Sequence, residues 1–237
     1  MGTELTEEKQ LNPENLNERL RNEVIEGQEG AAEQTAREIM NAGANPVEVI
    51  EKCLSSAMKF VGEKFEKGDC FLTDLMSAAA AMKAATRILG AAIRKEDRER
   101  MQARRLGRVV IGTVSGDVHD IGKNIVTLLL DANDFDTNDL GRDVDSMNFI
   151  EKAKELESDM IALSALMTTT MPAQREVIDF LKDMNLRERY TVVVGGSPTT
   201  KDWADQIGAD GWAETAEQAV RLAQELLQRR EPSRKVK

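Results

Sequence analysis

The sequence predicts an α plus α/β protein, in which a four-helix bundle precedes a five-stranded, doubly wound parallel sheet. Residues 13–95 are rich in Ala, Met, Leu and Glu and contain no convincing strand, whereas the later part alternates short β-branched runs with longer amphipathic segments. The segment KEDRERMQARR between them is almost wholly charged or polar. We therefore expect a bundle at residues 1–95, a linker at 96–106 and an α/β domain at 107–237.

Turn residues divide the first part into about four helices. Gly27, the segment Gly43-Ala44-Asn45-Pro46 and Gly68-Asp69 are signals for helix ends and starts. Two of the helices repeat apolar residues at every third or fourth position, so each has one apolar face to bury, and a bundle satisfies both faces. These apolar positions are Val47, Ile50, Leu54, Met58 and Val61, and then Leu72, Leu75, Met76, Ala79 and Met82.

Five strands are expected in the second part. Three are clear β-branched runs, at residues 108–114, 160–165 and 190–194, and two are weaker candidates, at 135–140 and 209–212. Strands that alternate with helices form a parallel sheet of the flavodoxin or Rossmann-like type, whose ligand lies at the carboxyl ends of the strands. The expected helices lie at about 121–132, 146–157, 172–184, 201–207 and 215–229.

Composition excludes several classes of partner. The chain has 32 Lys and Arg against 42 Asp and Glu, and the net charge of −10 repels phosphate backbones and anionic membrane surfaces. We therefore expect neither nucleic acid nor membrane as a partner, and no apolar run approaches the roughly 20 residues that cross a bilayer. Cys53 and Cys70 lack the spacing of a metal knuckle or a redox pair, so reduced thiols in a cytoplasmic protein are expected.

The loop after the first strand, SGDVHDIGKN, contains His119, which is the only histidine of the chain. A histidine binds a metal through one ring nitrogen while a carboxylate or carbonyl accepts the proton of the other. Asp117 and Asp120 are both close enough in sequence to be that carboxylate. A solvated or merely hydrogen-bonded loop histidine is the alternative.

Two more strand-end loops carry marked sequences. Beside Asp117-x-His119-x-x-Gly122, the chain has Ser164-x-Leu166 at the end of the third expected strand and Gly195-Gly196 at the end of the fourth. Together they resemble the pattern DxHxxG, SxL and GG of the cobalamin-binding domain shared by methionine synthase, the base-off mutases and the corrinoid proteins of methyltransferase systems. Three elements at three strand ends are more specific than any single glycine motif.

The resemblance implies that the chain binds cobalamin or methylcobalamin in the base-off/His-on form. His119 then replaces the dimethylbenzimidazole of the cofactor as lower axial ligand of cobalt. Asp117 accepts the proton of the His119 ring nitrogen that faces away from cobalt. Thr170 supplies the hydroxyl that completes this relay of ligand, carboxylate and hydroxyl, at a position where the family usually has serine. Any one glycine of the pattern, taken alone, indicates no more than a turn. The remaining positions that the resemblance assigns to the cofactor and its nucleotide tail are Gly116, Asp120, Ile121, Gly122, Ser164, Leu166, Thr168, Gly195 and Gly196.

The bundle is similar to the helical cap of the methyl-carrying members of this family. There a segment Gly-x-x-Phe-Leu, matched here by residues 68–72, lies over the upper face of the corrin and shields the methyl group. The resemblance therefore implies that Phe71, Leu72 and Met76 contact the cofactor. The alternative is that these residues, with Leu75, form only the core of the bundle. Two tryptophans, Trp203 and Trp212, are expected to be packing residues.

The function implied is that of a corrinoid methyl carrier, which takes a methyl group on cobalt and cycles between Co(I) and methyl-Co(III). The sequence shows no second catalytic domain, no large barrel and no iron–sulfur cysteine set, so the chain has no complete active site of its own. We expect it to work with a substrate-specific methyltransferase, an acceptor methyltransferase and a reductive activase. The methyl donor stays open, with methanol, a methylamine, a methoxylated aromatic, a betaine and a methylthiol as alternatives.

Three other functions are compatible with parts of the sequence. An adenosylcobalamin-binding sensor or regulatory module would need an output module, and none is visible before Leu16 or after Gln228. The cobalamin subunit of an adenosylcobalamin mutase usually lacks a helical cap, so the first 95 residues argue against it. A flavodoxin-like module for another nucleotide would explain the fold but would leave the three-part pattern as coincidence.

Overall fold

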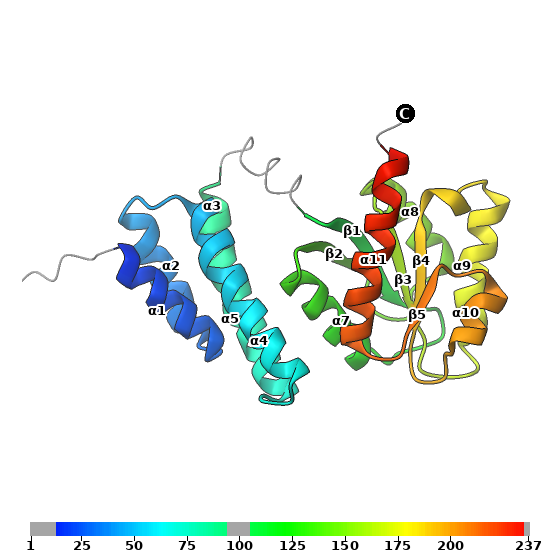
Figure 1. Cartoon of the computed structure of the whole chain (residues 1–237), viewed down its shortest axis with the longest axis horizontal. Coiled ribbons are helices and arrows are strands. Elements are labelled where there is room, and N and C mark those ends of the chain that lie inside the picture. Colours follow the sequence, from blue (N-terminus) through cyan, green and yellow to red (C-terminus); the bar gives the residue numbers. More distant parts are fainter. Residues whose placement is uncertain (1–12, 94–104, 235–237) are drawn as a thin grey trace, which may run out of the picture. The chain divides into compact units, whose positions relative to one another are not determined.

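A computed structural model describes residues 13–93 and 105–234 of the chain (Figure 1). Contacts divide the chain into two compact units, Met1–Met101 and Gln102–Lys237, and each is described by itself. Most of the predicted linker, residues 96–104, lies outside the described residues, so its structure stays a prediction.

The first unit is helical, as predicted. Asn45 caps the third of its helical rods, because its side-chain oxygen accepts the backbone N–H of Val47 at 3.0 Å. That rod contains a π-helical stretch, η1, which the apolar periodicity did not reveal. The elements are α1 (Pro13–Ile25), α2 (Glu29–Asn41), the continuous set α3 (Pro46–Val49), η1 (Ile50–Leu54) and α4 (Ser55–Glu66), and finally α5 (Leu72–Ala91).

The buried face of α5 differs from the predicted one. Leu75 is fully buried, but Met76, about 100° further round the helix, is 54% exposed, and Phe71 just before the helix is 79% exposed. The interpretation of Phe71 and Met76 as bundle core is therefore wrong. Small side chains make up most of the buried face of α5, which contacts α2. The buried positions of α5 are Leu75, Ala78, Ala81, Ala84, Ala85 and Leu89.

Both cysteines are free thiols, and they should differ in reactivity. Burial raises the pKa of the Cys53 thiol to about 11, and it raises that of the partly exposed Cys70 as well. Since the thiolate is the reactive form, we expect iodoacetamide at pH 8 to alkylate Cys70 at least about tenfold faster than Cys53. Mass spectrometry of the labelled peptides measures both rates. Equal rates would show that the core around η1 opens freely.

The second unit is a five-stranded parallel sheet in the order β2-β1-β3-β4-β5, which confirms the predicted fold class. The last helix runs on to Arg234, beyond the predicted end. The strands are β1 (Gly107–Thr113), β2 (Phe135–Asp139), β3 (Met160–Ser164), β4 (Thr191–Gly195) and β5 (Gly211–Ala213). The helices are α7 (Ile121–Ala132), α8 (Ser146–Glu155), α9 (Met171–Asp183), the 3-10 turn η2 (Arg187–Arg189), α10 (Lys201–Ile207) and α11 (Ala216–Arg234).

The register of the sheet brings four strand ends to one level. Thr113 of β1 pairs with Ser164 of β3, Ser164 with Gly195 of β4, and Gly195 with Ala213 of β5. The loops that follow these strands therefore start side by side at the carboxyl edge. The chain reverses its strand order between β1 and β3, and in such sheets this is the point where ligands bind.

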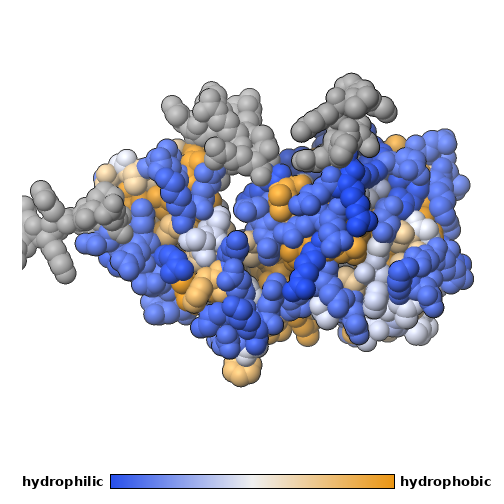
Figure 2. All heavy atoms as spheres, viewed as in Figure 1, coloured by the Kyte–Doolittle hydropathy of each residue, from blue (hydrophilic) through white to orange (hydrophobic). Residues whose placement is uncertain are grey.

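Helices cover both faces of this sheet. In Figure 1, α7 and α11 lie on one face and α8, α9 and α10 on the other. The core on the second face includes Phe149, Ile178 and Tyr190, and Trp203 and Trp212 pack against it partly buried, as predicted. Figure 2 shows a largely hydrophilic surface on each unit with small hydrophobic patches, consistent with a chain that is 31% charged. Among the described residues, no helix is both long and apolar enough to span a membrane.

Candidate functional site

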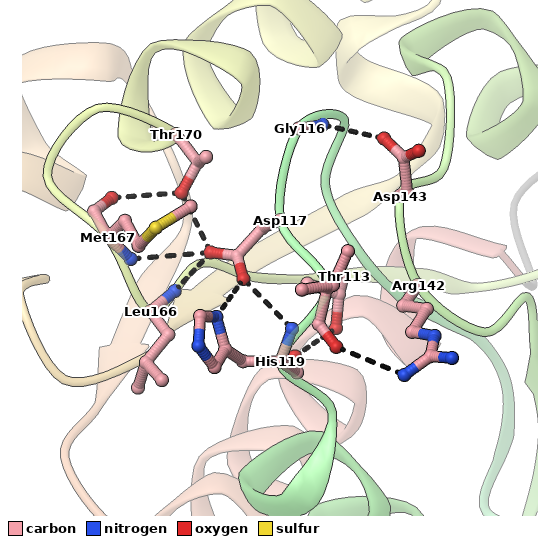
Figure 3. Close-up of polar contacts among 10 residues, drawn as sticks. Thr113, Gly116, Asp117, His119, Arg142, Asp143, Leu166, Met167 and Thr170 are labelled. Atoms are coloured by element: carbon pink, nitrogen blue, oxygen red, sulfur yellow. Dashed lines mark hydrogen bonds and ion pairs between the residues drawn. The ribbon is translucent and has the colours of Figure 1, made fainter.

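His119 lies in the loop between β1 and α7, and a buried carboxylate holds its ring (Figure 3). Oδ1 of Asp117 lies 2.8 Å from Nδ1 of His119 and also accepts the backbone N–H of His119 at 3.0 Å. The side chain of Asp117 is fully buried, whereas that of His119 is 47% exposed. Of the two carboxylates that lie close to His119 in sequence, Asp117, the one that the resemblance implies, contacts the ring, and Asp120 does not.

Asp117 is anchored by groups from the loop after β3. Its Oδ2 accepts the backbone N–H of Leu166 at 2.7 Å, that of Met167 at 3.3 Å and the hydroxyl of Thr170 at 2.8 Å. Burial alone raises the pKa of Asp117, but these bonds and those from His119 outweigh it and hold the pKa well below its usual range. Asp117 is therefore an anion at neutral pH.

The charge of Asp117 decides the tautomer of His119. A carboxylate can only accept hydrogen bonds, so Nδ1 must carry the proton that it shares with Oδ1. In the neutral ring, the lone pair is then on the other nitrogen, Nε2, and the side chain is 47% exposed. This is the arrangement found where a histidine binds a metal and a carboxylate orients it.

A cavity of about 200 Å³ opens beside this loop, between α7, the start of α11 and the carboxyl half of the sheet. Its walls are largely aliphatic, and Gly122, Ser164, Gly195 and Gly196 of the predicted site line it. Other lining residues were not indicated by any sequence pattern. They are Glu214, Thr215 and Ala216, which follow β5, together with Ile125, Val126, Ala219 and Leu222. The position of residues 214–216 after a predicted strand was the one signal that could have found them.

The other predicted residues lie outside this cavity. Thr168 is exposed on the loop after β3, and Gly116 lies at the turn before Asp117. Ile121 and Leu166 are exposed apolar side chains, and so is Val118 beside His119, which the sequence analysis did not single out. An exposed imidazole is thus accompanied by apolar side chains, a combination that suits a large, flat, partly apolar ligand.

The glycines at the edge of the cavity serve two different purposes. A Cβ at Gly196, whose φ is +115°, would lie 1.8 Å from the carbonyl oxygen of Ala165, so the fold itself requires glycine there. A Cβ at Gly122 would meet no heavy atom within 4 Å. No protein contact requires glycine at position 122, and its open side adds to the space available for a ligand.

Comparisons with known proteins agree on one family. Two models, each described as a B12 binding domain, match residues 16–89 and 107–221. The dimethylamine corrinoid protein 2 of Methanosarcina acetivorans is 51% identical over 83% of this chain and 88% of its own length, and a corrinoid protein of Desulfitobacterium hafniense is 41% identical over 90% and 97%. The crystal structure of the methanol:cobalamin methyltransferase complex from Methanosarcina barkeri matches with a TM-score of 0.80 and 31% identity, over 90% of this chain and 80% of that one. The chain therefore belongs to the family of B12-binding corrinoid proteins.

Proposed function

We propose that this chain is a methyl carrier that binds cobalamin with His119 as the lower axial ligand of cobalt and serves partner methyltransferases. The observation that carries the proposal is the chain of contacts from Thr170 through the buried Asp117 anion to Nδ1 of His119. It leaves Nε2 free to bind a metal whose other ligands arrive with a cofactor.

The residues present fit that cofactor. The cavity beside the loop is the proposed place of the nucleotide tail, with Gly122, Ser164 and Gly195 along it. Thr168, which is exposed on the loop after β3 and lies outside the cavity, is proposed to bond a part of the tail that lies outside it too. The exposed Val118, Ile121 and Leu166 are proposed to lie against the lower face of the corrin. A largely aliphatic cavity with few polar groups is typical of sites that bury a large ligand.

When bound, the cofactor supplies a cobalt centre that accepts a methyl group from a donor and releases it to an acceptor. The protein residues control the axial ligand. Thr170 and two backbone amides stabilise the negative charge of Asp117, so the proton stays on Nδ1. Polarisation of the ring by the carboxylate makes Nε2 a stronger metal ligand. The lowered pKa of Asp117 opposes full transfer of this proton.

The cap residues are proposed to shield the methyl group. Phe71 and Met76 are exposed apolar side chains at the start of α5, and Leu72 between them is half-buried. Large apolar side chains that are not in the core of their own unit are available to cover a ligand, and an apolar cover excludes water from the bond between carbon and metal.

We propose that the partners are a donor methyltransferase, an acceptor methyltransferase and a reductive activase, and that they meet this carrier in the cytoplasm. The similarity to a chain of a methyltransferase complex supports the first of these. A methylated amine is the proposed donor, since relatives that are 48–51% identical are named dimethylamine corrinoid proteins, whereas the methanol system matches at 31%. Free cysteines agree with a reducing compartment.

The test is reconstitution with hydroxocobalamin and methylcobalamin, followed by gel filtration and absorption spectroscopy. We expect the chain to retain cobalamin with a base-off/His-on spectrum, and His119→Ala to lose that spectrum, because no other imidazole exists in the chain. Asp179→Asn is the matched control and should keep the spectrum, since Asp179 is exposed on α9 and its ion pair is with Lys182 of the same helix. Failure of the unaltered chain to retain either form of the cofactor would refute the proposal.

A further inference from the structure

Beyond the residues that resemble the family pattern, the loop between β2 and α8 contacts the His119 loop at several points (Figure 3). The carboxylate of Asp143 accepts the backbone N–H of Gly116 at 2.7 Å, and the backbone N–H of Asp143 donates to the carbonyl oxygen of Asp117 at 2.9 Å. Arg142 adds a long contact of 3.5 Å from its guanidinium to the carbonyl oxygen of Val118. Asp143 thus makes two hydrogen bonds to the Gly116-Asp117 segment, one to the N–H at its start and one to the carbonyl oxygen at its end.

The backbone of Asp143 is in a conformation that few residues adopt. Its φ is +53°, in the left-handed region, where the Cβ of a residue with a side chain lies close to the following carbonyl oxygen. That conformation directs both its N–H and its carboxylate toward the same loop. Gly116 is left-handed as well, with a φ of +79°. The two unusual turns are bonded to each other, so each helps to hold the other in place.

The loop that carries Asp143 is itself fixed at its base. The buried amine of Lys123, from the first turns of α7, bonds the carboxylate of Asp139 at the end of β2. Asp139 also accepts the N–H of Gly141 at 2.8 Å, and the carbonyl of Gly141 accepts the N–H of Thr113 at 2.9 Å. The loop between β2 and α8 is therefore bonded to β1, β2 and α7, and β1 and α7 are the elements on either side of the His119 loop.

We infer that Asp143 is a positioning residue for His119: it holds the backbone turn that aims Nε2 of His119 toward the ligand, without touching the ring. The inference rests on the proposed function, because the ligand in question is the cobalt of cobalamin. The side chain of Asp117 orients the ring of His119. Asp143 orients the backbone of the loop that contains both Asp117 and His119.

Variants at position 143 distinguish the effect of the Asp143 carboxylate from the effect of its left-handed backbone conformation. Asp143→Ala removes the acceptor for Gly116 and disfavours the left-handed turn, and Asp143→Gly removes the acceptor alone. Asp143→Asn keeps a side-chain oxygen and a residue that tolerates positive φ. We expect the ratio of His-bound to His-free cobalamin to fall about tenfold in the Ala variant, less in the Gly variant and hardly at all in the Asn variant.

The matched control is Asp145→Ala on the same loop. Asp145 caps α8 by accepting the N–H of Met147 at 2.8 Å, so its loss should destabilise the unit and lower its urea unfolding midpoint. It should leave the His-bound spectrum unchanged, because Asp145 makes no bond to the His119 loop among the described contacts. Equal loss of the spectrum in the variants at 143 and 145 would reduce the effect to general destabilisation and overturn the inference.

Hydrogen exchange of the Gly116 amide, measured on the chain without cofactor, gives a second readout. We expect this amide to lose protection in Asp143→Ala and to regain it in Asp143→Asn. Unchanged protection overturns the inference. Cobalamin that stays fully His-bound in Asp143→Ala overturns it too, while the His119→Ala result shows separately whether the proposed function stands.

Discussion

Asp117→Asn is expected to lower the free energy of unfolding by about 3 kcal/mol, because a buried anion that accepts several hydrogen bonds is replaced by a group with one acceptor oxygen. If the new amide NH₂ takes the place of Oδ2, it faces the N–H groups of Leu166 and Met167. If it takes the place of Oδ1, it faces the N–H of His119. Either orientation points a donor at a buried donor.

The same substitution should also disturb the ligand. With the NH₂ toward the ring, Nδ1 of His119 must accept a hydrogen bond, so the proton moves to Nε2, the nitrogen proposed to bind cobalt. Urea unfolding of the chain without cofactor measures the loss of stability, and the spectrum of the cobalamin complex measures the loss of His ligation. A variant with unchanged stability and an unchanged His-on spectrum would contradict the role given to Asp117.

The pH dependence of this effect has a defined sign. The pKa of Asp117 in the folded chain lies below its ordinary value of 3.8, so its contribution to stability is present above that value and is lost as the pH falls toward the folded pKa. The difference in stability between the unaltered chain and Asp117→Asn should be constant above about pH 5. It should narrow below pH 3.8, and a difference that grows in acid would contradict the assignment.

Gly196→Ala should have the largest effect on stability, with a loss of more than about 4 kcal/mol. The new Cβ would lie 1.8 Å from the carbonyl oxygen of Ala165 and 2.7 Å from its carbonyl carbon, and φ at this position is +115°. The clash is with backbone, and Ala165 cannot retreat without breaking its bond to the carbonyl of Gly195 at 3.1 Å. Soluble expression and urea unfolding measure the outcome.

Gly122→Ala is the matched control for this prediction. Its Cβ meets nothing within 4 Å, and alanine favours the first turn of α7, so the unfolding free energy should stay unchanged or rise. The methyl group would occupy part of the proposed tail site, so retention of cobalamin should weaken. A Gly122→Ala chain that is unstable, or a Gly196→Ala chain that is fully stable, would contradict the conclusion that the fold requires glycine at position 196 but not at position 122.

Much of the fold was predictable because its signals are local. The β-branched runs and the helical repeats of the second unit depend on the period of each element, and the structure has a strand or a helix at each of those places. The contact between Asp117 and His119 also joins near neighbours in one loop, so sequence distance alone made it a candidate. Sequence distance could not choose between Asp117 and Asp120, because both lie close to the histidine.

The apolar face of α5 shows where the local pattern fails. Periodicity counts every apolar residue at helical spacing, so it included Met76 with Leu75. The bundle instead buries the side of α5 that carries Leu75, Leu89 and four alanines, and it leaves Met76 exposed. Which side of a helix is buried depends on the shape of its neighbour as well as on hydrophobicity.

Local patterns along the chain were enough to predict the order of helices and strands, the strand-end positions of the three motif segments and the single imidazole available to a ligand. The contacts around that imidazole depend on how the chain folds. Thr170, which the family resemblance implies, and Asp143, which no pattern indicated, reach the His119 loop from separate strand ends, and residues 214–216 reach the cavity from a third. Parallel strands in register bring distant loops to one edge of the sheet, and the spacing of residues along the chain does not contain this convergence.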